Sequence, residues 1–312
     1  MAETLDKPTA RRHHYVPQGY LAGFTHTGTK GGQFFVLDVN TGESFRTSPK
    51  NVAAERDFNR IDIEGRSPDA IERALAPFEQ KALDAIRRTI AASEFPNPKD
   101  CNFILNFLGL IAVRNPRFRG LFNRAREHTV NVISDKLASD KKVWEHHMRK
   151  ARKAGEHIPD TVSFEDFKSF VEERRYRIEF LPQGNLPVEF RAFDEVLPIL
   201  GQRTWSQFIA PADGPEFVCS DHPVTLVWKN GQRGPVGYAL QETEVFFPLG
   251  RSVGFYGTFE EFVRPVVRLR PDNVARLNRR VAVNADRHVY SAQSVFAMWH
   301  EGRVRDVFCK PS

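Results

Sequence analysis

Two adjacent histidines near the start of the chain are the side chains best suited to chemistry. His13 and His14 stand in a dense block, residues 12–24, beside Tyr15 and, after a proline that fixes the backbone, Gln18. An imidazole exchanges a proton near neutral pH, and a Gln amide both donates and accepts hydrogen bonds. The block therefore predicts a polar site in which the histidines are catalytic and Tyr15 and Gln18 bind a substrate.

The same block predicts how these side chains are held. Neighbouring side chains of a strand point to opposite faces, so one histidine is expected to face a pocket while the other braces it. From Tyr20 onward, the apolar residues Tyr20, Leu21 and Phe24 have the spacing of the first turns of a buried helix. The alternative is that both histidines are surface residues of a frayed N-terminus.

A catalytic carboxylate is expected from the second half of the chain. A predicted buried strand, residues 217–220, ends at Asp221, which His222 and Pro223 follow. A carboxylate at a strand end is well placed for acid or base chemistry, although an Asp turn that bonds its own backbone is the alternative. Glu244 is the second candidate, because it enters a very apolar run where a carboxylate must either find a cation or have a raised pKa.

Three arginines surround an amide at the end of an apolar predicted helix. Arg114, Arg117 and Arg119 have the geometry to bind DNA phosphates, and Asn115 is expected to read a base edge. The alternative is that the arginines form salt bridges with Glu55 and Asp57. Tyr15, Tyr20 and Trp205 are the predicted aromatic walls of the substrate site.

Positive charge is concentrated in residues 114–153. This segment has twelve Lys or Arg against four acidic residues, a net charge of +8, whereas the whole chain carries +6 with a pI near 9.3. Release of counterions gives such a stripe a sequence-independent affinity for nucleic acid, so Lys141, Lys142 and Arg149 are predicted DNA contacts. A solvated helix without a partner would show the same composition.

The order of periodic segments predicts an α+β fold. Helical spacing dominates from Ser67 to about residue 200, and short alternating runs follow from Arg203. We expect a single large domain over residues 1–312, in which a mainly helical N-terminal half packs on a mainly antiparallel β C-terminal half. The Pro/Gly break at residues 182–187 suggests a subdivision into 1–181, with an N-terminal hairpin, and 188–312.

Several classes of protein are disfavoured by what the chain does not contain. Three isolated cysteines lack metal-ligand spacing, no glycine-rich phosphate loop is present, and no run approaches the length of a membrane helix. The His146-His147 pair has no third ligand nearby in sequence. We therefore expect no metal, no cofactor, no nucleotide and no membrane partner, and a cytoplasmic location, since residues 1–10 lack a signal-peptide pattern.

The opening block resembles the start of domain-of-unknown-function family 4238, whose members begin with His-His-Tyr-Val-Pro-Gln-x-Tyr-Leu-x-x-Phe. Later stretches are similar in order: Arg114-Asn115-Pro116-Arg117, then Ser220-Asp221-His222-Pro223-Val224, then Phe247-Pro248-Leu249. The resemblance spans nearly the whole chain. It implies bacterial anti-phage defence, including a branch that resembles DNA glycosylases, and it supplies no catalytic residue.

The combined hypothesis is an anti-phage DNA glycosylase. Such an enzyme would flip a modified base, for example of the glucosylated hydroxymethylcytosine type, and cleave its N-glycosidic bond to leave an abasic site. Asp221, with Glu244 in reserve, would be the carboxylate, and His13 or His14 would orient water or the sugar. Two alternatives stay open: a metal-dependent nuclease that uses the N-terminal histidines, and a non-catalytic sensor of nucleic acid or another phage component.

Overall fold

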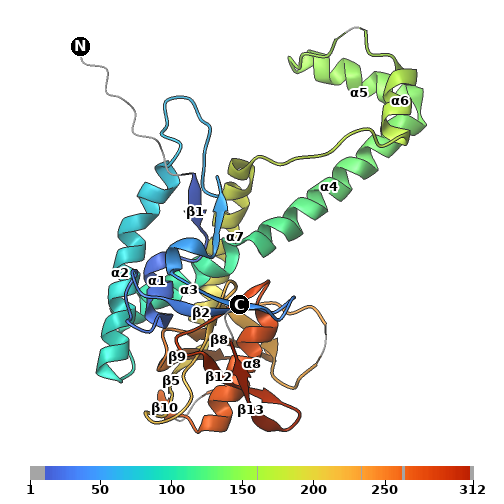
Figure 1. Ribbon diagram of the computed structural model, residues 1–312. Coiled ribbons are helices and arrows are strands. Elements are labelled where there is room, and N and C mark those ends of the chain that lie inside the picture. Colours follow the sequence, from blue (N-terminus) through green and yellow to red (C-terminus); the bar gives the residue numbers. More distant parts are fainter. Residues whose placement is uncertain (1–10, 160, 233, 262–263, 310–312) are drawn as a thin grey trace, which may run out of the picture. The chain divides into compact units, whose positions relative to one another are not determined.

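The computed structural model describes residues 11–159, 161–232, 234–261 and 264–309 (Figure 1). The chain forms two compact units. The first combines the described parts of Met1–Asn115 and Pro182–Ser312, and the second is Pro116–Leu181. The predicted subdivision at residues 182–187 coincides with one end of the second unit, but the two halves of the sequence share the first unit.

The opening block folds as predicted, extended and then helical. Strand β1 (Arg12–His14) pairs antiparallel with β4 (Ala54–Arg56), and helix α1 (Gln18–Leu21) continues into the 3₁₀ turn η1 (Ala22–Phe24). Gly19 allows α1 to approach the next helix closely, since a Cβ at this position would meet Leu83 Cδ1 at 2.4 Å. The turn η2 (Pro49–Asn51) precedes β4.

Three helices form one layer of the first unit. Helix α2 (Ala70–Ala92) packs on α3 (Pro98–Val113), and α3 packs on α7 (Leu186–Gly201), which follows the turn η3 (Pro182–Asn185). Asn97 caps α3 by accepting a hydrogen bond from the Asp100 N–H, and Pro98 occupies the first turn. Helix α3 is apolar nearly all round, and its last seven residues are all buried, as a central helix requires.

A five-stranded sheet forms the next layer, in the order β10-β5-β9-β8-β7. Its strands are β5 (Thr204–Ile209), β7 (Thr225–Trp228), β8 (Thr243–Pro248), β9 (Val253–Thr258) and β10 (Val266–Arg268). All pairs are antiparallel except β10 with β5. Every residue of β8 and β9 is buried, because the helical layer covers one face of the sheet and α8 (Pro271–Asn284) covers the other.

A smaller sheet joins the two ends of the chain, in the order β3-β2-β11-β6. The predicted N-terminal hairpin is β2 (Phe34–Asp38) and β3 (Ser44–Thr47), with Gly42 at φ +76° in the turn. Strand β11 (His288–Ser291) lies between β2 and β6 (Cys219–Ser220). A final hairpin, β12 (Val295–His300) with β13 (Arg303–Phe308), packs against α8.

The second unit is helical and has a small core of its own. Helices α4 (Pro116–Ser139), α5 (Lys141–Lys153) and α6 (Phe164–Glu172) surround Trp144, whose ring lies 5.8 Å from Phe164 and 6.3 Å from Phe167. Asp140 caps α5, and Ser163 caps α6 and forms a capping box with Asp166. These caps end α4 and orient the short helices.

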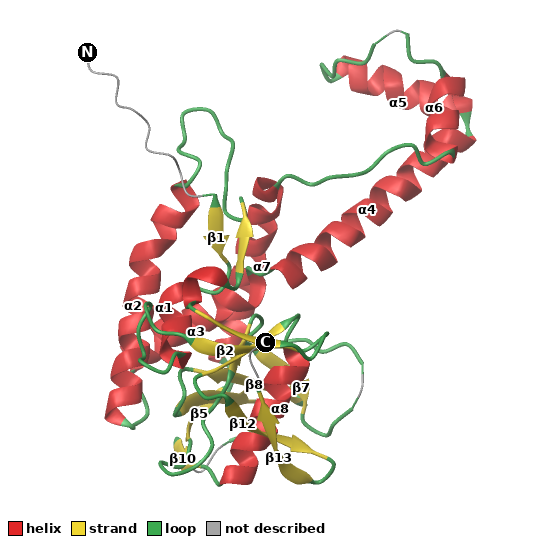
Figure 2. Cartoon of the chain, viewed as in Figure 1, coloured by secondary structure: helices red, strands yellow, loops and turns green. Residues whose placement is uncertain are grey.

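The predicted α+β class is confirmed, with helices mainly in the first part of the sequence and antiparallel-rich sheets in the second (Figure 2). Strands β10, β12 and β13 were not predicted as strands. The expected strand at residues 217–220 is shorter than predicted, since only its last two residues pair with β11.

Candidate functional site

The opening block and α2 enclose a cavity of about 390 Å³ in the first unit. His13, His14 and Gln18 come from the opening block, and charged side chains come from α2 and its N-terminus. The lining residues are Arg12, His13, His14, Pro17, Gln18, Gly19, Lys30, Asp69, Glu72, Ala76, Glu79, Gln80 and Leu83. Most of these side chains are polar or charged, so the cavity suits a ligand rich in hydroxyl or amide groups.

Two glutamates of α2 face this cavity from the same side of the helix. Glu72 and Glu79 are seven residues apart, two helical turns, or about 10 Å along the axis. Pro77 lies between them and removes one backbone hydrogen bond from this part of the helix. Burial is the main cause that raises the pKa of Glu79, and the nearby charge of Glu72 adds to it, while Arg114 and Lys30 oppose it. Burial thus favours the protonated form of Glu79 more than it would be favoured in an exposed glutamate.

Asn59 fixes the other glutamate. Its side-chain Nδ2 donates to Glu72 Oε1 at 2.6 Å, and its Oδ1 accepts from Arg114 Nη2 at 2.5 Å. Its backbone N–H donates to His13 Nδ1 at 2.9 Å, so a neutral His13 ring carries its proton on Nε2. Asn59 is only 3% exposed, and these bonds hold Glu72, His13 and Arg114 in one arrangement.

His14 holds Gln18 in place. Its Nε2 lies 3.2 Å from the Pro49 carbonyl oxygen, which can only accept, so Nδ1 accepts from Gln18 Nε2 at 3.3 Å. Burial lowers the pKa of His14 and favours this neutral form. Gln18 Oε1 is left to accept a hydrogen bond from a ligand.

A second, small cavity adjoins the first. It has a volume of about 10 Å³, space for about one water molecule, and Tyr15, Glu79 and Arg114 line it together with His14. Burial raises the pKa of Tyr15, and the charges of Asp221 and Glu55 act in the same direction. Tyr15 is therefore a neutral phenol, and it lines the same small cavity as Glu79.

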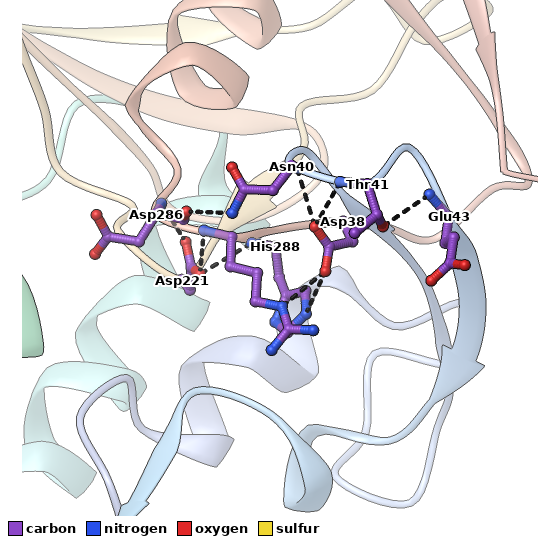
Figure 3. A network of polar contacts seen from close by, with 8 residues as sticks. Asp38, Asn40, Thr41, Glu43, Asp221, Asp286 and His288 are labelled. Atoms are coloured by element: carbon purple, nitrogen blue, oxygen red, sulfur yellow. Dashed lines mark hydrogen bonds and ion pairs between the residues drawn. The ribbon is translucent and has the colours of Figure 1, made fainter.

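Asp221 lines neither of these cavities. It belongs to a network that joins β6, β11 and the β2-β3 hairpin (Figure 3). Its carboxylate accepts three backbone N–H bonds, from Asp286 at 2.9 Å, Arg287 at 2.8 Å and His288 at 2.9 Å. In the same network, Asp38 accepts from Arg287 Nε at 2.7 Å. Burial raises the pKa of Asp221, while the N–H bonds oppose that shift. This geometry corresponds to a carboxylate that organises a loop.

Two of the predicted aromatic walls lie in the core. Tyr20 is 2% exposed, stacks on Phe247 with ring centroids 5.1 Å apart, and donates to the Pro248 carbonyl at 2.5 Å. Trp205 is 7% exposed and donates from Nε1 to the Leu200 carbonyl at 2.8 Å. Both rings therefore pack α1 and α7 against the sheet, and of the three predicted walls Tyr15 lines a cavity near the carboxylates.

The amide and arginine at the end of α3 also have local partners. Asn115 donates from Nδ2 to the carbonyls of Ile111 and Ala112, which satisfies the end of α3. Arg114 is 6% exposed and lies 3.6 Å from Glu189 Oε2, in addition to its bond with Asn59. Asp57, one of the two carboxylates considered as partners of these arginines, pairs with Arg11.

Glu244 forms its ion pair outside the candidate site. It is 6% exposed in β8 and pairs with Arg280 of α8 at 2.6 Å, which is the ion pair that a buried carboxylate needs. Glu244 is on the opposite side of the sheet from α2, so the structure does not bring it to His13 and His14.

The predicted DNA contacts belong mainly to the second unit. Arg117 is half-buried and Arg119 is buried, whereas Lys141, Lys142 and Arg149 are exposed on α5. Lys141 pairs with Glu165 at 3.2 Å. Among the described residues no carboxylate pairs with Lys142, Arg149 or Lys150, so their charges are available to an anion.

No group of three or more His, Cys, Asp or Glu side chains in the described ranges is arranged to hold a metal ion. His13 Nδ1 and both ring nitrogens of His14 already have hydrogen-bond partners. A metal-dependent nuclease would therefore need these bonds to change.

Sequence reasoning missed Asn59, Glu72, Glu79 and Glu189. The spacing of Asp69, Glu72 and Glu79, three and then seven residues apart, places them on one face of a helix and was the signal available. Nothing local distinguished Asn59, because its role depends on three segments that are distant in sequence.

Fold and cavity together define an α+β protein with paired carboxylates beneath an N-terminal histidine block. A family model described as "Protein of unknown function (DUF4238)" matches residues 12–294, so the chain belongs to this family, as the opening motif predicted. Comparisons with curated proteins and with solved structures gave no significant match. Among the described helices, none has both the length and the apolar character needed to cross a membrane.

Ionisation of Glu79 is expected to weaken the fold. Its pKa in the folded protein is raised above 4.5, so the stability that it contributes is complete below this pH and is lost as the pH rises through the folded pKa. The difference in free energy of unfolding between wild type and Glu79→Gln, measured in urea, should therefore fall as the pH rises from below 4.5. The exposed Glu64→Gln is the control, and a pH-independent difference for Glu79→Gln would contradict the expectation.

Replacement of Asp221 should reduce stability. Asp221→Ala leaves three buried N–H groups without their acceptor, and we expect a loss of about 3 kcal/mol in the free energy of unfolding. Asp213→Ala, at an exposed carboxylate, should stay within about 0.5 kcal/mol of wild type. Equal urea midpoints for wild type and Asp221→Ala would refute the structural role.

Proposed function

We propose that this protein is a hydrolase that cleaves the N-glycosidic bond of a modified base in DNA and leaves an abasic site. The observation that carries the proposal is the pair of glutamates in one polar cavity, Glu79 with its pKa raised by burial and Glu72 held by Asn59. Two carboxyl groups in different environments are the usual machinery of glycosidic bond hydrolysis.

The different environments of the two glutamates assign them different catalytic roles. The carboxylic acid of Glu79 donates its proton to the departing base, which breaks the N-glycosidic bond at the sugar carbon. The carboxylate of Glu72, oriented by Asn59, takes a proton from the water that attacks that carbon. Their separation by two helical turns leaves room for the water and the sugar, as in hydrolases that invert configuration.

The opening block supports binding in this scheme. Gln18 Oε1 accepts a hydrogen bond from a sugar hydroxyl or a base amine, and His14 holds the amide in that orientation. The polar lining of the cavity suits a base that carries a sugar better than a plain aromatic base, because the described lining contains no aromatic ring apart from the two imidazoles. This favours a glucosylated base as the substrate class.

DNA as the polymer is supported by the second unit. Helix α5 has six Lys or Arg residues and one acidic residue, Glu145, and most of its cations are exposed. Phosphate contacts by such a helix supply affinity without sequence preference. An anti-phage role is part of the proposal through the family resemblance of the opening block.

The activity test uses purified protein in excess EDTA with phage DNA that contains glucosylated hydroxymethylcytosine and with unmodified DNA. Alkali-dependent strand breaks, seen by denaturing electrophoresis, are expected only in the modified DNA. Glu79→Gln and Glu72→Gln should lower the rate about 100-fold or more, as expected for loss of an acid or base, and Glu64→Gln should not.

Other results would change the assignment. Loss of breakage in Asp221→Asn, with Glu79→Gln fully active, would return the carboxylate role to Asp221. Direct cutting that requires added magnesium would establish a nuclease instead. DNA binding with no breakage in either condition would indicate a sensor.

Neutralising α5 should weaken DNA binding and its dependence on salt. The triple variant Lys142→Gln, Arg149→Gln, Lys150→Gln removes up to three phosphate contacts, so the slope of log K against log salt concentration should fall by about 2 to 3. Fluorescence anisotropy of a labelled duplex, titrated at several salt concentrations, measures the affinity and its dependence on salt. The control is Arg66→Gln, Arg279→Gln, Arg303→Gln, which removes the same charge from the first unit; an equal loss in the control would refute a role for α5.

A further inference from the structure

A separate cavity, distinct from the two already described, lies on the opposite face of the five-stranded sheet, between the sheet and α8. Its volume is about 430 Å³, within the range of small-molecule sites. It is lined by side chains from β5, β9, β10 and α8 and shares no residue with the cavity of the opening block. The two sites are therefore chemically independent.

One wall of this cavity is aromatic and apolar. The rings of Phe208 and Tyr256 stack with centroids 4.7 Å apart and an interplanar angle of 16°. Leu269 and Leu277 continue the apolar surface from the loop before α8 and from α8 itself. An apolar ring fits such a surface because packing against it removes apolar area from water without leaving polar groups unpaired.

The polar end of the cavity has an excess of positive charge. Arg280 is paired with Glu244 at 2.6 Å, and Lys229 is paired with Glu260 at the rim. Arg276 instead lies over the ring of Trp299, 3.4 Å from its centroid, and forms no ion pair with any described carboxylate. Arg276 thus keeps its charge and its N–H donors for an anion.

The ion pair between Arg280 and Glu244 fixes the position of the Arg280 guanidinium at the polar end of the cavity. Glu244 and Arg280 both bond the hydroxyl group of Tyr256, so the guanidinium of Arg280 is held next to the ring that forms the wall. Arg276 and Arg280 are four residues apart on α8 and so face the same side. A carboxylate placed between them would lie at the edge of the Phe208 and Tyr256 rings.

We propose that this cavity is a binding site for a small aromatic carboxylate, with the ring on Phe208, Tyr256 and Leu277 and the carboxylate on Arg276. The site is separate from the glycosidic chemistry and does not depend on it. A neutral analogue with the same ring would bind through the wall alone, and an aliphatic carboxylate through the arginine alone.

The test is calorimetric titration of the full-length protein with 1-naphthoate. We expect one site per chain, with affinity at least about tenfold higher than for 1-naphthamide, because a charge-assisted hydrogen bond is lost in the amide. Arg276→Gln should weaken 1-naphthoate binding by about tenfold and leave 1-naphthamide unchanged. Arg279→Gln, an exposed arginine on the same helix outside the cavity, is the matched control and should bind as wild type does.

A second variant tests the wall. Val267→Trp, on the edge strand β10, fills the cavity with a ring and should abolish binding while circular dichroism shows an unchanged fold. The proposal is overturned if 1-naphthoate does not bind, if Arg276→Gln and Arg279→Gln weaken it equally, or if the folded Val267→Trp binds normally. It is also overturned if Glu79→Gln, in the other cavity, removes the binding.

Discussion

The hydrogen bonds of Asn59 are the interactions on which the candidate site depends. One buried residue bonds His13 of β1 through its backbone, Glu72 of α2 through its amide nitrogen and Arg114 at the end of α3 through its amide oxygen. A buried amide must satisfy its donors and its acceptor, so each partner is fixed by the requirement that none be left unpaired. Because these partners come from separate elements, the cavity can form only after β1, α2 and α3 have packed together.

The five-stranded sheet separates two cavities whose linings differ. Strands β8 and β9 are buried on both faces, so the helical layer and α8 are held apart by a continuous apolar layer. On the helical side, the cavity is polar and contains two glutamates, one of which has a raised pKa. On the side of α8, the cavity has an aromatic wall and a surplus of arginine. The first cavity suits hydroxyl and amide groups and the cavity beside α8 suits an apolar ring with an anionic group, so the two would select different ligands.

Many polar residues that suggested chemistry are used to build the fold. Asp221 accepts three backbone N–H groups, and Asn115 satisfies the end of α3. Each lies where a loop or helix end brings backbone polar groups into the interior, and such groups need partners there. A short polar side chain in an apolar stretch of sequence therefore predicts either a site or a loop anchor. Only the positions of its neighbours in space distinguish the two.

The sequence alone determined the α+β class, the family, the extended and then helical opening block, the N-terminal hairpin and the concentration of charge on α5. These features depend on periodicity, turn chemistry and composition, which are local properties of the chain. The tertiary structure decided which carboxylates meet the histidines. Glu72 and Glu79 were visible as one face of a helix, but their selection required Asn59 and the burial of Glu79, and the core positions of Tyr20 and Trp205 required the sheet. Burial and hydrogen bonding between distant segments depend on the packed arrangement of the whole chain, and a linear pattern does not encode them locally.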